Sequence, residues 1–170
     1  MSGPVLAGIQ ANATARVQNF AAMSADLCGF RLEIIAPSYD PVDLKTLYLN
    51  TADQRAGQPQ VDALIALYLS LKGKPAQQIA DALLETQSSS PSPTAMLAQT
   101  LVKLWYLGIW YGANNSAEVI SANAYIGGLT WKAAQAHPMG YSEFMFGYWN
   151  QPPAPLSSFG LDVEGDNNND

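Results

Sequence analysis

The sequence has little of the chemistry that most metal and redox sites need. It contains one cysteine, Cys28, and one histidine, His137, in 170 residues. A single cysteine excludes an intrachain disulfide, and one cysteine with one histidine excludes a metal cage made of those residue types alone. The same counts exclude covalent haem attachment and a cysteine-ligated iron–sulfur cluster.

Charge is also scarce. Only 13% of the residues are charged, which is about half the usual proportion for a soluble domain, whereas 48% are hydrophobic. Eight Lys and Arg residues stand against 14 Asp and Glu residues, so the net charge is −6. Because the few basic residues are scattered, we expect no binding of nucleic acid.

Much of the negative charge lies in the last nine residues, which contain Asp162, Glu164, Asp166 and Asp170 and no base. We expect a disordered acidic tail over 157–170. The chain before these nine residues has eight basic and ten acidic residues, few for a soluble monomer. Either uncharged polar side chains solvate this body, or a partner covers part of it.

Long hydrophobic runs are missing too. The most apolar stretch, 95–111, contains Gln99, Thr100 and Lys103 near its middle, so we expect no membrane span. Near the start, a short apolar segment over 3–9 precedes the small-residue triplet 11–13. We expect residues 1–13 to be a flexible N-terminus or the remnant of an export signal.

Glycine-rich nucleotide motifs are absent. The pair Gly127-Gly128 lacks the third glycine of a dinucleotide-binding loop, and no phosphate-binding loop sequence occurs. We therefore expect no cofactor and no metal ion to be bound by this chain itself.

Apolar residues recur at helical spacing along most of the chain. A short apolar run over 32–35 is stopped by Pro37, and Gly29 closes the helix before it. Asp40 is the expected cap of a helix that starts at Pro41, with Asp43 in its first turn. The segment 61–71 is apolar nearly all round, which predicts a buried helix. The expected helices span 14–27, 41–50, 61–71, 75–84, 94–111 (capped by Thr94) and 116–124.

No internal repeat and no alternating strand pattern occurs. The fold class we expect is mainly α: one helical domain over 14–156. Gly, Pro and aromatic residues over 137–155 predict an irregular, aromatic and Pro-rich C-terminal arm.

Aromatic residues are the most concentrated feature. We expect Trp105 and Tyr106 to lie in the core. Later aromatic residues beside Pro-Pro are typical of partner-binding hot spots. The predicted partner-binding residues are Trp131, Phe144, Phe146, Tyr148, Trp149, Pro152 and Pro153.

An alternative class of function stays open at this point. A small standalone helical enzyme or binding protein would use His137 together with a carboxylate such as Glu143. Cys28, next to Gly29, is typical of a small packing residue rather than of a reactive thiol.

Three motifs, in order along the chain, resemble one family. Phe20-Ala-Ala-Met-Ser-Ala-Asp-Leu27-Cys-Gly29 resembles the opening of the small subunits of membrane-bound FAD-dependent sugar and polyol dehydrogenases. Trp105-Tyr106-Leu-Gly108 is similar to their W-Y-x-G helix motif. Tyr148-Trp149-Asn-Gln-Pro152 is similar to their closing aromatic arm.

The resemblance implies a non-catalytic accessory subunit of a heterotrimer. Its partners would be a large flavoprotein that carries FAD and an iron–sulfur cluster, and a multihaem cytochrome c subunit. The small subunit would stabilise the flavoprotein and assist its twin-arginine export into the periplasm. There it would be held at the inner membrane by the complex.

Overall fold

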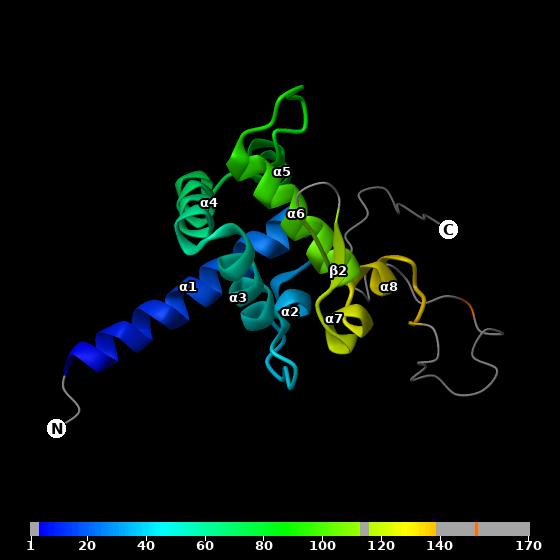
Figure 1. The fold of residues 1–170 in the computed structure, drawn as a ribbon, viewed down its shortest axis with the longest axis horizontal. Helices are drawn as coiled ribbons and strands as arrows, with labels where there is room; N and C mark the ends of the chain where they lie inside the picture. The colour runs from blue at the N-terminus through cyan, green and yellow to red at the C-terminus, as the bar shows by residue number, and fades with distance from the viewer. Residues whose placement is uncertain (1–3, 113–115, 139–151, 153–170) are drawn as a thin grey trace, which may run out of the picture. The chain divides into compact units, whose positions relative to one another are not determined.

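The computed structural model describes residues 4–112, 116–138 and 152, and these are mainly α-helical, as the sequence predicts (Figure 1). Within this helical domain the contacts separate two compact units, Met1–Val102 and Lys103–Asp170. Each unit is described by itself below.

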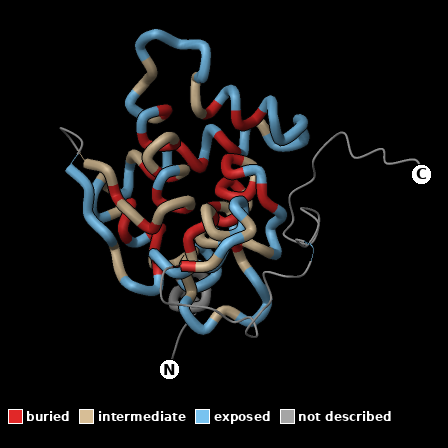
Figure 2. The backbone as a smooth tube through the Cα atoms, turned by 90° about the vertical axis from the view of Figure 1, so that its right-hand side faces the viewer, coloured by how far each residue is buried: buried red, intermediate tan, exposed pale blue. Residues whose placement is uncertain are grey.

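The first unit is built around one long helix, α1 (Pro4–Cys28). The other elements are α2 (Leu32–Ile35), α3 (Leu44–Ala56), α4 (Gln58–Leu71), α5 (Ala76–Leu84) and the first part of α6 (Pro93–Leu107). The second half of α1 carries its buried residues, α1 contacts α2, α3, α4 and α5, and α4 also contacts α3 and α5. Figure 2 marks the buried residues in red.

The core of the first unit is apolar apart from Ser24 and Thr51. Both hydroxyls donate to the carbonyl four residues earlier in their own helix, so neither is left unpaired. Apart from alanines, the apolar side chains with at most 2% exposure in this unit are Phe20, Met23, Ile35, Tyr48, Leu49, Val61, Leu64, Leu83 and Leu101.

An ion-pair cluster joins three helices of this unit. The Arg16 guanidinium on α1 donates to both carboxylate oxygens of Asp53 on α3, at 2.7 and 2.8 Å, and to Asp62 on α4 at 2.6 Å. The hydrogen bond with Asp53 is the main reason that the pKa of Arg16 lies above its ordinary value. This forked geometry holds the three helices in one relative position.

The end of α1 follows the sequence expectation, and the start of α3 does not. Gly29, at φ 71°, ends α1, and the N–H of Phe30 donates to the Ala25 carbonyl at 3.2 Å. The helix expected from Pro41 instead begins at Leu44, because Asp43 has a left-handed φ of 51° and donates its N–H to Asp40 at 2.7 Å. That turn precedes the helix and delays its start.

The N-terminal boundaries of two other helices also differ from the prediction. α1 begins at Pro4, ten residues before the expected start. α6 is capped by Ser92, whose hydroxyl accepts the Ala95 N–H at 3.1 Å, rather than by Thr94. Pro93 then occupies the first helical position, which proline favours.

The prediction that 61–71 is a buried helix is wrong for one side of α4. Val61, Leu64, Ile65 and Tyr68 are buried. The opposite side is exposed, and it carries Ala63, Ala66, Leu67, Leu69 and Ser70. Burial ends there because no other described element of this unit packs on that side of α4.

The second unit corrects two expectations. α6 ends at Leu107 rather than at Tyr111, because Gly108 at φ 67° reverses the chain into β1 (Ile109–Tyr111). The helix expected over 116–124 is instead β2 (Ala117–Val119), which pairs antiparallel with β1 with Trp110 opposite Glu118. Pairing with β1 satisfies backbone groups that a helix would have bonded locally.

Two short helices complete the second unit. Ser121 caps α7 (Ala122–Ile126) by accepting the Ala124 N–H at 3.0 Å. Gly127 and Gly128 then lead into α8 (Leu129–Ala133).

Replacing Arg16 by lysine tests the ion-pair cluster. Lysine keeps the charge but loses the fork, so we expect Arg16→Lys to lower the free energy of unfolding by about 1–2 kcal/mol. Chemical denaturation of Arg16→Lys, Asp53→Asn and the double variant measures the coupling. If the stability losses of the two single variants sum to the loss of the double variant, Arg16 and Asp53 are not coupled, and the role of the fork is contradicted.

Replacing Gly108 by alanine tests the turn after α6. A Cβ at Gly108 would lie 2.5 Å from the Ala124 backbone, on top of the strain at φ 67°, so we expect Gly108→Ala to cost about 3 kcal/mol. The matched control is Gly29→Ala, where φ is 71° but nothing lies within 4 Å, with a cost of about 1–2 kcal/mol. Thermal unfolding compares the two variants, and equal losses would contradict the close approach at Gly108.

Candidate partner surface

The first family motif occupies structural positions on α1. Phe20 is fully buried and Leu27 is 7% exposed, while Gly29 ends the helix. Cys28 is also buried, and burial raises the pKa of its thiol above the ordinary value. A thiol that stays protonated is a poor nucleophile, which fits a packing role.

The second motif forms the turn from α6 into β1. Trp105 is 2% exposed, whereas Tyr106 is half-buried. The backbone at Gly108 approaches Ala124, and the backbone at Gly128 approaches the Tyr106 carbonyl so closely that a Cβ would lie 2.7 Å from that oxygen. Gly128 therefore packs against the same turn as Gly108. The sequence motif, which ends at Gly108, gives no indication of this contact.

Trp131, a predicted partner-binding residue, lies on α8. Its indole Nε1 donates to the Tyr125 carbonyl at 2.8 Å, and the two rings meet edge to face with centroids 5.4 Å apart. The hydrogen bond fixes the ring, and the Trp131 side chain is half-buried. A held, half-exposed tryptophan is a good anchor, because little side-chain entropy remains to be lost on binding.

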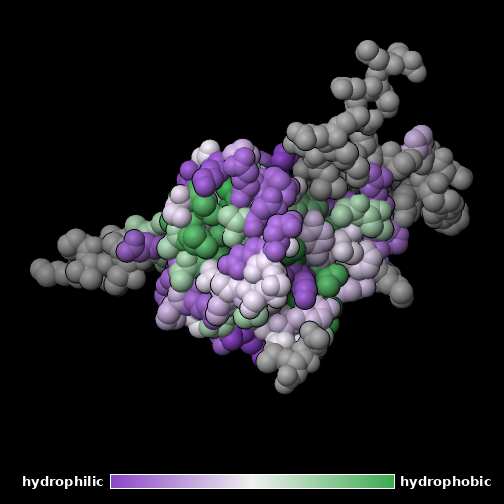
Figure 3. Space-filling model, turned by 90° about the horizontal axis from the view of Figure 1, so that it is seen from above, coloured by the Kyte–Doolittle hydropathy of each residue, from purple (hydrophilic) through white to green (hydrophobic). Residues whose placement is uncertain are grey.

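The second unit also has exposed apolar side chains on α7 and β2. Tyr125 and Ile126 are 36% and 37% exposed on α7, and Val119 is 54% exposed on β2, which contacts α7. We call Val119, Tyr125, Ile126 and Trp131 the α7 patch. In Figure 3, which draws one face of the molecule, hydrophobic side chains likewise reach the surface among hydrophilic ones.

Of the other predicted partner-binding residues, the structure describes Pro152 alone. Pro152 is exposed. The remaining five lie outside the described residues: Phe144, Phe146, Tyr148, Trp149 and Pro153.

The elements of the alternative, enzymatic hypothesis are not brought together in the described residues. His137 is half-buried, with Nδ1 3.0 Å from the Pro138 carbonyl oxygen. Its proposed carboxylate partner, Glu143, lies outside the described residues. In the described segments, no three His, Cys, Asp or Glu side chains are grouped as metal ligands. No described helix is both long and apolar enough to span a bilayer.

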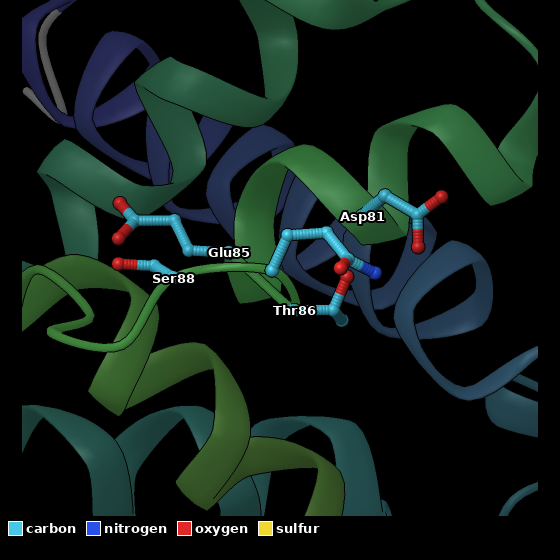
Figure 4. A pocket seen from close by; sticks show the side chains of 5 residues that line it. Asp81, Glu85, Thr86 and Ser88 are labelled. Atoms are coloured by element: carbon cyan, nitrogen blue, oxygen red, sulfur yellow. The ribbon is translucent and has the colours of Figure 1, made fainter.

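One shallow hollow of about 440 Å³ lies after α5. It is lined by Asp81, Glu85, Thr86, Gln87 and Ser88 (Figure 4). The carboxylates of Asp81 and Glu85 point to opposite sides, so they do not converge on a common point. No base or histidine lines the hollow, and the Glu85 carboxylate is already engaged elsewhere.

The partner of Glu85 is Ser92, at the start of α6. The Glu85 carboxylate accepts the Ser92 hydroxyl at 2.7 Å and the Ser92 N–H at 2.8 Å. These two hydrogen bonds, that of the hydroxyl first, lower the pKa of Glu85. Glu85 therefore closes the serine-rich loop between α5 and α6, which is a structural role.

Comparison of the chain with models of protein families, with curated proteins and with solved structures finds no match.

The Glu85–Ser92 pair makes a prediction about pH. A lowered pKa in the folded state means that the pair adds stability above the ordinary glutamate pKa of about 4.3 and loses it as the pH falls through the lowered value. We expect Ser92→Ala to raise the pKa of Glu85, measured by NMR titration of its carboxyl group. The control Ser89→Ala, in the same loop, leaves that pKa unchanged. A Glu85 pKa equal in all three proteins would contradict the closure of the loop by this pair.

Proposed function

We propose that this chain is a non-catalytic accessory subunit of an FAD-dependent sugar or polyol dehydrogenase complex. It binds and stabilises the large catalytic flavoprotein and accompanies it through twin-arginine export to the periplasm. FAD and an iron–sulfur cluster belong to that large subunit, and a multihaem cytochrome c subunit carries the electrons to the membrane.

The α7 patch is the observation that carries this proposal. Trp131 is oriented by its bond to the Tyr125 carbonyl and packs edge to face on the partly exposed Tyr125 ring, as an interface anchor does. Along the chain the patch is followed by four aromatic residues within 144–149, and the family's closing-arm motif is matched over 148–152. Both features favour binding to another protein.

The positions of the motif residues support the same proposal. Phe20, Leu27 and Trp105 pack in the interior, and Gly29 and Gly108 have left-handed φ values that favour glycine. The family motifs thus coincide with residues that this fold needs. The residues before the acidic tail carry few charges, and a sparsely charged surface is suited to burial against a partner.

Co-expression with the large flavoprotein from the same genome tests the proposal. We expect a stable complex that contains flavin, in which Trp131→Ala and Trp149→Ala each weaken association by about 2 kcal/mol, roughly thirty-fold in Kd. Tyr39→Ala is the control, because Tyr39 is an aromatic residue that is 83% exposed in the first unit. Isothermal titration calorimetry or surface plasmon resonance with the purified subunits measures the Kd of the complex for each variant.

Two results would contradict the proposal. One is that the unaltered chain retains no flavoprotein. The other is turnover by the purified chain alone that is lost in His137→Ala, which would establish the alternative enzyme.

A further inference from the structure

The Glu85 carboxylate ties together the two ends of the loop between α5 and α6. Residues 86–90 of this loop are all exposed. The Ser88 N–H donates to the Glu85 carbonyl at 2.8 Å, and the Ser90 N–H donates to the Ser88 hydroxyl at 3.2 Å, so these bonds are local. The bonds that join one end of the loop to the other are those from Ser92 to the Glu85 carboxylate.

The same carboxylate supports the cap of α6. The Ser92 hydroxyl donates to Glu85 at 2.7 Å and accepts the Ala95 N–H at 3.1 Å, so the capping group is itself held by Glu85. The Ser92 N–H donates to the other carboxylate oxygen at 2.8 Å. An ionised carboxylate accepts hydrogen bonds roughly twice as strongly as a neutral group. Loss of the charge therefore weakens the loop closure and the cap together.

Glu85 also lies at a strained position of the backbone. Its φ is 48°, in the left-handed region that residues with a Cβ rarely adopt. Such strain persists only where the surrounding contacts hold it. Because the two bonds to Ser92 anchor the Glu85 side chain, weakening them lets its backbone relax and the loop open.

Two further hydrogen bonds limit how far the opening can spread, because neither involves a titratable group. Gln99 Nε2 on α6 donates to the Leu84 carbonyl at 3.0 Å, and Gln60 Nε2 on α4 donates to the Pro93 carbonyl at 3.0 Å. Leu101, in the middle of α6, is fully buried. We therefore expect α5 and α6 to stay packed when the loop opens.

We propose that Glu85 is an acid-operated latch: when its carboxylate takes up a proton, residues 86–92 open and α6 loses its cap, while the rest of the first unit stays folded. The proton comes from solvent and returns to it, so the latch is reversible. Open, the loop is an exposed segment of the kind that proteases cut. The proposal does not depend on the flavoprotein.

The direction of the response follows from the bonds to Ser92. They lower the pKa of Glu85, so the latch is closed at neutral pH and opens as the pH falls below the ordinary glutamate value of about 4.3 and through the lowered one.

Among the described residues, the other charged side chains of the neighbouring elements are engaged elsewhere. On α5 the remaining one is Asp81, whose carboxylate accepts from Gln77 at 2.9 Å and points to the side opposite to Glu85 (Figure 4). Lys72 and Lys74 precede α5, at the end of that helix far from Glu85. The charged residues of α1, α4 and α6 and their partners are Arg16 with Asp53 and Asp62, Asp26 with the Tyr68 hydroxyl, and Lys103 with the Tyr111 ring.

Hydrogen exchange of the purified full chain, followed by NMR, tests the latch. Between pH 7 and pH 3 we expect the protection factors of the Ser92 and Ala95 amides to fall roughly tenfold or more, while that of Leu101 is kept. Glu85→Gln cannot ionise, so its Ser92 and Ala95 amides have the low protection already at pH 7. Asp81→Asn is the matched control on the same helix and behaves like the unaltered chain.

Limited proteolysis at pH 7 gives an independent readout. Proteinase K should cut Glu85→Gln within 86–92 faster than it cuts the unaltered chain or Asp81→Asn, and mass spectrometry locates the cut. Unchanged protection of Ser92 in Glu85→Gln, loss of Leu101 protection together with that of Ser92, or an equal effect of Asp81→Asn would each overturn the proposal.

Discussion

The fork between Arg16 and its two aspartates is the interaction on which the first unit depends. It ties α1 to Asp53 on α3 and to Asp62 on α4, with distances of 2.6 to 2.8 Å. It also divides α1: the residues after Arg16 pack into the core, and residues 10–15 before it are exposed. The same three residues thereby join the helices of the core and mark the point before which residues 10–15 of α1 are exposed.

Local signals in the sequence predict the helical part of the fold well. Gly29 ends α1 as predicted because a left-handed residue is required there, and the apolar face of 76–84 gives α5. The β1–β2 pair was missed, since strand pairing depends on residues that are apart in sequence. The start of α3 was misplaced because the side chain of Asp40 bonds the backbone of Asp43.

The candidate site was predictable only in part. Trp131 stood out as an aromatic residue, but its bond to the Tyr125 carbonyl depends on how α7 and α8 pack. The sequence shows that 61–71 is apolar nearly all round, but it does not show which side of α4 the rest of the unit covers. The sequence shows fifteen residues without a charged side chain before Arg16, but only the structure shows that residues 10–15 are exposed helix. Burial is decided by tertiary packing, which a periodicity cannot specify.

The central claim is that this chain acts by binding other chains rather than by catalysis. The most direct measurement is to purify the tagged chain at its natural expression level from its own cells and to record the mass and absorbance spectrum of what it carries. The account predicts a defined complex with flavin absorbance that contains a larger protein. A chain that elutes without any partner, and without flavin, would contradict it.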